Sequence, residues 1–81
     1  MRAEELLPDD VNQGEINGVT VRKGSVGAFL ANARTLTDPA AEARAIAEHD
    51  LAALLPALRA LGLFEVLQIR DERLRALAER Y

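Results

Sequence analysis

Cysteine is absent from this 81-residue sequence, and histidine occurs once, at His49. Small natural domains often gain stability from disulfides, a bound metal or a partner subunit. The composition excludes disulfides and leaves too few nitrogen and sulfur ligands for a zinc site, so we expect no metal and no cofactor. The lack of cysteine fits a reducing compartment, and we expect a cytoplasmic protein. A partner subunit therefore remains as a source of additional stability, and we expect a homodimer.

Aromatic residues are also few, with two phenylalanines, one tyrosine and no tryptophan. The core must therefore be built from small aliphatic side chains, which favours the packing of helices. The most apolar stretch, from Asp50 to Arg70, has so few polar residues that it must supply this core. Arg59, Glu65 and Gln68 interrupt it, whereas a membrane-spanning helix needs about 20 predominantly apolar residues. We therefore expect no membrane association.

Acidic residues outnumber basic ones, and the net charge is −3. Residues 1–15 carry five acids and one arginine, whereas residues 16–37 carry two arginines, one lysine and no acid. We interpret residues 1–14 as a polar, acidic, loosely ordered arm, and residues 15–81 as a single small globular domain. The field of the basic segment is partly cancelled by its acidic neighbours.

Two local patterns predict the first elements of this domain. Asn17-Gly18 lies between β-branched residues and favours a β-hairpin, because both residues tolerate positive φ in a tight turn. Apolar residues then recur at helical spacing, which predicts a helix from Val26 to Leu36 with Ser25 as its N-terminal cap. The apolar positions of this stripe are Val26, Phe29, Leu30, Ala33 and Leu36.

The chain after residue 37 predicts a helical region with a bend. Thr37-Asp38-Pro39 is a typical helix start, and we expect a helix that reaches about Glu48. A bend near His49-Asp50 would lead into a second helix that ends at Leu61 and is kinked or started by Pro56. The sequence leaves open whether this region is one kinked helix or two.

The stretch 63–70 fits both a strand and a helix. Phe64, Val66 and Ile69 have β preference, and a strand here would give the hairpin a third partner. We favour this strand, followed by a helix that begins near Asp71. The predicted fold class is α+β and mainly helical, with a short N-terminal β-hairpin and an optional third strand packed on three to four helices.

No residue cluster in the sequence points to catalysis. His49 is expected near the end of a helix, where a histidine is ordinarily structural. Lys23-Gly24-Ser25-Val26-Gly27 superficially resembles a nucleophile elbow, but Lys23 stands where the first glycine is required. A phosphate-binding loop of the nucleotide hydrolases also fails, because the lysine precedes the glycine instead of following it. We expect a protein without enzyme activity.

The sequence indicates one candidate anion-binding site. Backbone N–H groups from Gly24 to Gly27 would open a helix beside Arg22 and Lys23, and such groups hold phosphates or carboxylates. Small anion or ligand binding is therefore one hypothesis of function. The candidate residues are Arg22, Lys23, Gly24 and Ser25, with Asn32 and Arg34 as candidates for a polar surface site.

We predict that the protein acts by binding other protein chains, as a protein-interaction or assembly module. Two copies would bury Leu- and Ala-rich helix faces and present the hairpin or the acidic arm to a partner protein. The alternative is a DNA-binding or antitoxin-like regulator, since a strand at Val19 to Lys23 followed by two helices superficially resembles the ribbon-helix-helix regulators. The basic segment 16–37 would make few phosphate contacts. The arginines from Arg70 to Arg80 alternate with acids as on a solvent face, so we rank nucleic-acid binding below protein contact.

Overall fold

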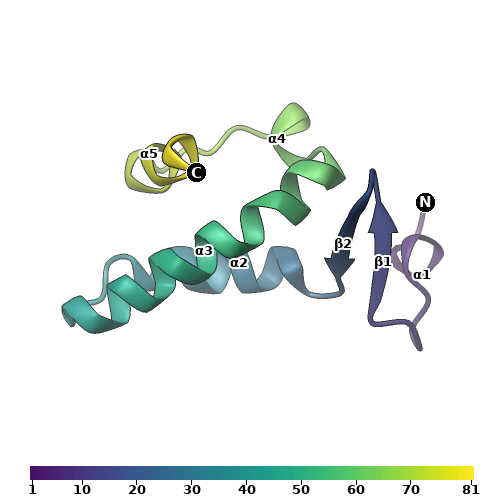
Figure 1. Cartoon of the computed structure of the whole chain (residues 1–81), viewed down its shortest axis with the longest axis horizontal. Helices are drawn as coiled ribbons and strands as arrows, with labels where there is room; N and C mark the ends of the chain where they lie inside the picture. The colour runs from purple at the N-terminus through teal and green to yellow at the C-terminus, as the bar shows by residue number, and fades with distance from the viewer.

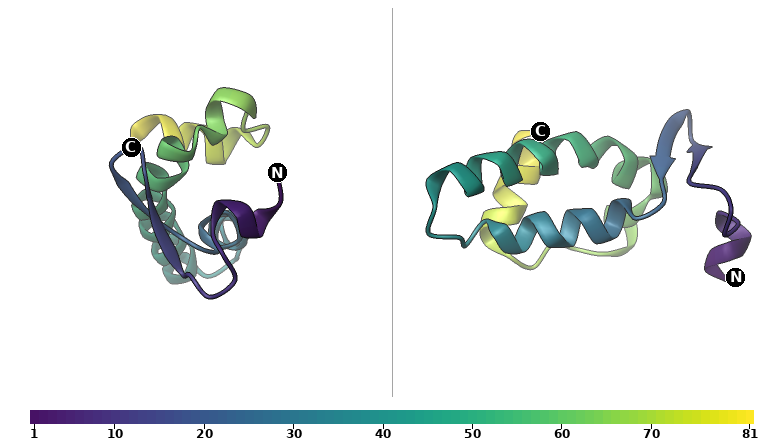
Figure 2. Two further views of the ribbon diagram at one scale, coloured as in Figure 1. Left: turned by 90° about the vertical axis from the view of Figure 1, so that its right-hand side faces the viewer. Right: turned by 90° about the horizontal axis from the view of Figure 1, so that it is seen from below.

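A short arm and a β-hairpin precede an antiparallel pair of helices in the computed structural model, which describes all 81 residues (Figure 1). Two smaller helices follow and lie across one side of the pair (Figure 2). The predicted class, α+β and mainly helical, is confirmed. The elements are α1 (Ala3–Leu6), β1 (Gln13–Ile16), β2 (Val19–Arg22), α2 (Ser25–Thr35), α3 (Ala41–Leu61), α4 (Leu63–Val66) and α5 (Glu72–Arg80).

The hairpin turns where the sequence predicts it. Asn17 and Gly18 have φ angles of 49° and 80°, which these two residue types adopt more readily than others. The strands pair antiparallel, with Ile16 opposite Val19. Strand β1 begins at Gln13, inside the segment predicted as the arm.

The predicted third strand does not form, because the sheet has only two strands. Gly62 ends α3 in the left-handed conformation, with φ 82°, and the chain continues at once as the helical turn α4. Three residues of this region pack against the helical core: Leu63, Phe64 and Ile69. Their burial against the helices outweighs the local β preference, which depends strongly on packing context.

Helix α2 confirms the predicted helix to within one residue at each end, but its cap differs. The cap residue is Gly24, with φ 89°, and no side chain caps the helix. Ser25 is the first helical residue and is buried, and its hydroxyl donates to the carbonyl oxygen of Arg22 at 2.6 Å. The prediction that Ser25 is the cap is therefore wrong.

Helix α3 runs without interruption from Ala41 to Leu61, so the bend predicted near His49-Asp50 is absent. Pro56 lies inside the helix and is exposed to solvent. Because proline has no backbone N–H, the helix loses one hydrogen bond here, on the side where water can bind the free carbonyl oxygen. The opposite side is packed along its length. Its buried residues are Ala47, Leu51, Leu55 and Leu58.

The core lies where α2, α3 and α5 meet, and the expected Asp50 to Arg70 stretch supplies only part of it. After Leu61 the chain leaves the core, and Val66 and Leu67 are 84% and 57% exposed. Helix α5 begins after Asp71, as predicted, and the Asp71 carboxylate accepts the backbone N–H of Leu74 at 2.9 Å. None of the helices combines the length and the apolarity that crossing a bilayer requires. The core residues are Phe29, Leu36, Ala47, Leu51, Leu55, Leu58, Leu74 and Leu77.

Candidate functional site

The four predicted anion-binding residues lie together at the turn from β2 into α2. They line a hollow of about 410 Å³. The Lys23 ammonium donates to the carbonyl oxygen of Pro8 at 2.7 Å and so holds the N-terminal arm. Glu4 and Asp9 line the same hollow, and their negative charges oppose an anion there. The structure thus brings the predicted residues together but directs Lys23 and the Ser25 hydroxyl to backbone carbonyls.

Asn32 and Arg34 do not join this group. The Asn32 side-chain amide donates to the carbonyl oxygen of Ala28 within its own helix at 2.9 Å. Arg34 lies in the last turn of α2, whereas Lys23 precedes the first. At 1.5 Å per residue, about 16 Å of helix separates them. The basic segment 16–37 therefore presents its charges at two ends of a helix and not on one patch.

The apolar stripe predicted for α2 is covered only in part. Phe29 and Leu36 are buried and Ala33 is half-buried, but Val26 and Leu30 are 39% and 50% exposed. The reason is that α2 packs along a single helix, α3, while α4 and α5 pack chiefly on α3. One side of α2 is left without a partner element.

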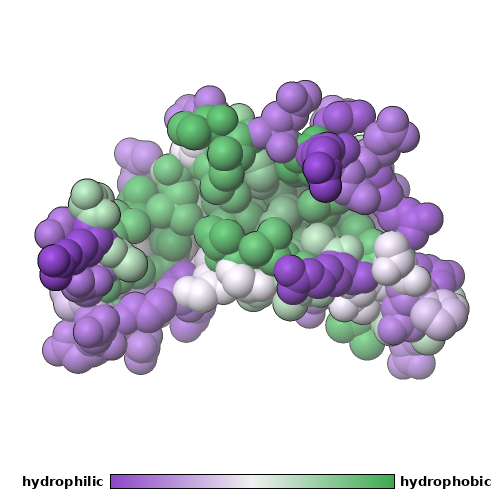
Figure 3. All heavy atoms as spheres, turned by 180° about the vertical axis from the view of Figure 1, so that it is seen from behind, coloured by the Kyte–Doolittle hydropathy of each residue, from purple (hydrophilic) through white to green (hydrophobic).

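Helix α4 extends this uncovered surface. The rings of Phe29 and Phe64 lie 6.1 Å apart between centroids, so α4 lies beside α2 at this point. Val66 and Leu67 follow Phe64 and are exposed. Figure 3 shows hydrophobic atoms across the middle of the side opposite to the view of Figure 1, hollowed at the centre and bordered by hydrophilic atoms. The exposed large apolar residues of α2 and of the segment that follows Phe64 are Val26, Leu30, Val66 and Leu67, and we call them the apolar face.

The sequence predicted part of this face. It placed Val26 and Leu30 on the apolar stripe of α2, but it did not show that these two residues would stay exposed. Their exposure depends on where α4 and α5 pack, which no pattern within α2 reports. Val66 was expected in a strand beside the hairpin, but it ends the helical turn α4, whose Phe64 lies against Phe29 of α2.

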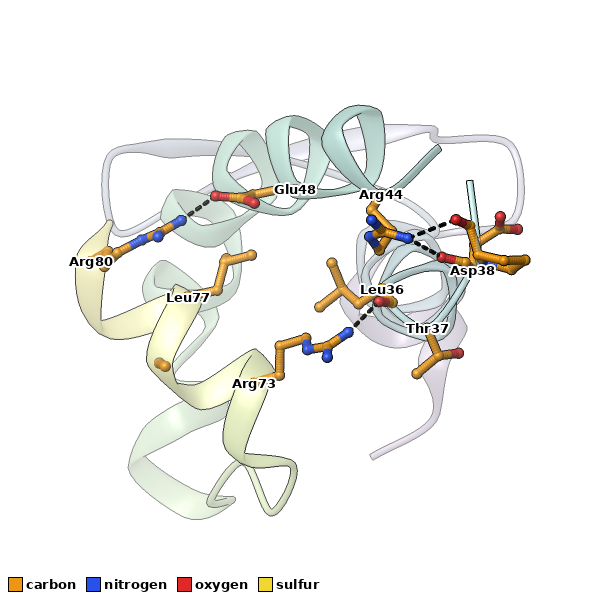
Figure 4. A pocket seen from close by; sticks show the side chains of 10 residues that line it. Leu36, Thr37, Asp38, Arg44, Glu48, Arg73, Leu77 and Arg80 are labelled. Atoms are coloured by element: carbon orange, nitrogen blue, oxygen red, sulfur yellow. Dashed lines mark hydrogen bonds and ion pairs between the residues drawn. The ribbon is translucent and has the colours of Figure 1, made fainter. Parts of the chain in front are cut away.

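Sequence interpretation also missed a group of arginines. A second hollow, of about 620 Å³, lies between α5 and the segment that joins α2 to α3 (Figure 4). Arg44, Arg73 and Arg80 line it, although Arg73 and Arg80 had been assigned to a solvent face. No local signal could have related Arg44 to the other two, because they are far apart in the sequence and meet only through packing of α5 on α3.

The titratable residues show no arrangement suited to metal binding. No group of three or more histidine, aspartate or glutamate side chains lies close enough to hold a metal ion. His49 is exposed on α3. The chain matches no protein-family model, no curated protein sequence and no solved structure.

Proposed function

We propose that the protein is a non-enzymatic self-assembly module, in which two copies pair through the apolar face. The observation that carries this proposal is the exposure of Leu30 and Val26 on the same stripe as the buried Phe29. Contiguous apolar surface on a small protein ordinarily marks a contact with another molecule. A second copy presents the same surface and is always available at the concentration of the first, as in most soluble oligomers.

The shape of the molecule supports a paired state. The molecule measures 39 × 25 × 21 Å, and its accessible surface is 5918 Å². A standard interface buries about 800 Å² per partner, which the broad side of the molecule can supply. Only 10 of the 81 residues are buried within one chain, so a partner would add substantially to a small core.

Sedimentation equilibrium at micromolar concentrations tests this proposal. The chain mass is 8.8 kDa, and we expect a particle of twice this mass. Leu30→Glu places a charge on the apolar face, and we expect this variant to sediment as a monomer because burying an unpaired carboxylate is costly. Leu67→Glu places a charge after α4 and should act in the same way.

Ile46→Glu is the matched control, because Ile46 is 57% exposed on α3 and is not among the residues packed against the core. This variant should remain a dimer. Far-ultraviolet circular dichroism should show equal helix content in all three variants. A wild-type mass of 8.8 kDa at 100 µM, or equal dissociation by the Ile46 variant, would overturn the proposal.

A further inference from the structure

The hollow beside α5 is lined by both basic and apolar side chains (Figure 4). Arg44 reaches it from α3, and Arg73 and Arg80 reach it from α5. Leu36 and Leu77 contribute apolar surface to the same hollow. A volume of about 620 Å³ is of the size that small-molecule and side-chain binding pockets have.

Two of the three guanidinium groups lack a negative partner. Arg73 Nη1 donates to the carbonyl oxygen of Leu36 at 2.6 Å. Arg44 Nη1 donates to the carbonyl oxygens of Asp38 and Pro39 at 2.6 and 3.0 Å. Neither arginine takes part in an ion pair. Because a guanidinium carries five N–H donors, both groups keep donors and a full positive charge for another acceptor.

These backbone contacts also hold the two arginines in place. The Leu36 carbonyl belongs to the cap at the end of α2, and the Asp38 and Pro39 carbonyls belong to the segment before α3. An arginine that is already positioned loses less conformational entropy when it binds a ligand. The planar fork of a guanidinium matches the two oxygens of a carboxylate.

Charges of both signs surround the hollow. Asp38 and Glu48 line it together with the arginines. Glu48 is paired with Arg80, so that its charge is compensated, whereas the Asp38 carboxylate accepts a neutral backbone N–H, from Ala40 at 2.8 Å. Because Coulomb energy scales with charge, a phosphate dianion would be repelled by Asp38 and attracted by the arginines about twice as strongly as a singly charged carboxylate, so charge alone does not select between them. The apolar lining does, because Leu36 and Leu77 can contact a short hydrocarbon portion, which phosphate lacks.

We propose that this hollow is a carboxylate-binding site, in which Arg73 and Arg44 hold the carboxylate and Leu36 and Leu77 contact the apolar part of the ligand. The ligand class is a singly charged carboxylate with a short apolar portion. A free organic acid and an acidic residue of a peptide both offer this chemistry. The site shares no residue with the apolar face, so it stands independently of self-association.

Titration followed by ¹H–¹⁵N NMR spectroscopy tests this site, with butyrate, inorganic phosphate and an acetylated tripeptide that contains one glutamate as probes. Butyrate should shift the arginine Nε–H signals of Arg44 and Arg73 and the backbone amides of residues 36–38 in a saturable manner. Phosphate at equal ionic strength should bind more weakly. Tighter binding of the tripeptide would assign the site to peptides, and equal binding would assign it to free acids.

Substitutions separate a specific site from general charge attraction. Arg73→Gln should weaken butyrate binding at least tenfold. Arg73→Lys keeps the charge and a donor for the Leu36 carbonyl, but it loses the fork, and binding should fall with the fold intact. Arg70→Gln removes an exposed charge outside the hollow and should leave binding unchanged. Absence of saturable shifts at residues 36–38, equal loss from Arg70→Gln, or stronger binding of phosphate would overturn the proposal.

Discussion

The rings of Phe29 and Phe64 lie 6.1 Å apart between centroids and are tilted by 57°. This geometry lies between stacked and perpendicular arrangements, both of which are favourable for aromatic pairs. Phe29 is buried in the middle of α2, and Phe64 is half-buried in α4. Their contact joins the turn after α3 to the opposite helix, and it determines where the exposed residues after Phe64 stand relative to α2.

Phe29 should be the most sensitive position of α2. We expect Phe29→Ala to lower the free energy of unfolding by about 3–5 kcal/mol, since it leaves a cavity and removes the aromatic contact. A domain of this size has a total stability of roughly 4–12 kcal/mol, so the variant loses at least about a quarter of its stability and, at the lower end of this range, all of it. Urea denaturation monitored by circular dichroism measures this. Val26→Ala on the same helix should cost less than about 1 kcal/mol, because Val26 is partly exposed; equal costs would contradict the packing described.

Asn17 should contribute through both its backbone and its side chain. Its amide donates to the carbonyl oxygen of Ala60 at 2.8 Å, which joins the hairpin turn to the end of α3. Asn17→Gly keeps the left-handed backbone and loses this bond, and we expect a cost of about 1 kcal/mol. Asn17→Ala loses both, and we expect about 2 kcal/mol. Thermal unfolding compares the two variants, and an alanine variant no less stable than the glycine variant would refute the backbone contribution.

The start of α5 should depend on the Asp71 carboxylate. Asp71→Ala removes the acceptor of the Leu74 backbone N–H and should cost about 1 kcal/mol, as loss of a helix cap generally does. Hydrogen exchange of the Leu74 amide should accelerate. Asp71→Ser retains a capping oxygen and should behave nearly as the wild type. Unchanged exchange at Leu74 in the alanine variant would show that the cap does not stabilise α5.

The end of α5 should depend on a residue of another helix. Arg59 of α3 donates from Nη1 to the carbonyl oxygen of Tyr81 at 3.0 Å and from Nη2 to that of Ala78 at 2.9 Å. Arg59→Ala should fray the last turn of α5 and lower global stability by about 1 kcal/mol, a modest value because the site is exposed. Hydrogen exchange in residues 77–81 is the direct measurement. Arg70→Ala, an exposed charge without such contacts, should leave this exchange unchanged.

Several features could be predicted from the sequence because they depend on neighbouring residues alone. The turn at Asn17-Gly18 follows from the tolerance of these two residues for positive φ. The helix of residues 25–35 follows from the spacing of its apolar side chains, and the start of α5 from the capping carboxylate of Asp71. The helical content and the fold class follow from the same local signals.

Tertiary packing decided the rest, because the deciding contacts join residues far apart in the chain. Burial of one side of α3 keeps that helix continuous through Pro56. Burial of Phe64 against Phe29 makes residues 63–66 helical despite their β preference. The same long-range packing leaves Val26 and Leu30 uncovered and places Arg44, Arg73 and Arg80 around one hollow. The sequence alone determined which residues are apolar and where the hairpin turns. Only the packed structure decided which apolar and basic side chains remain available for contact.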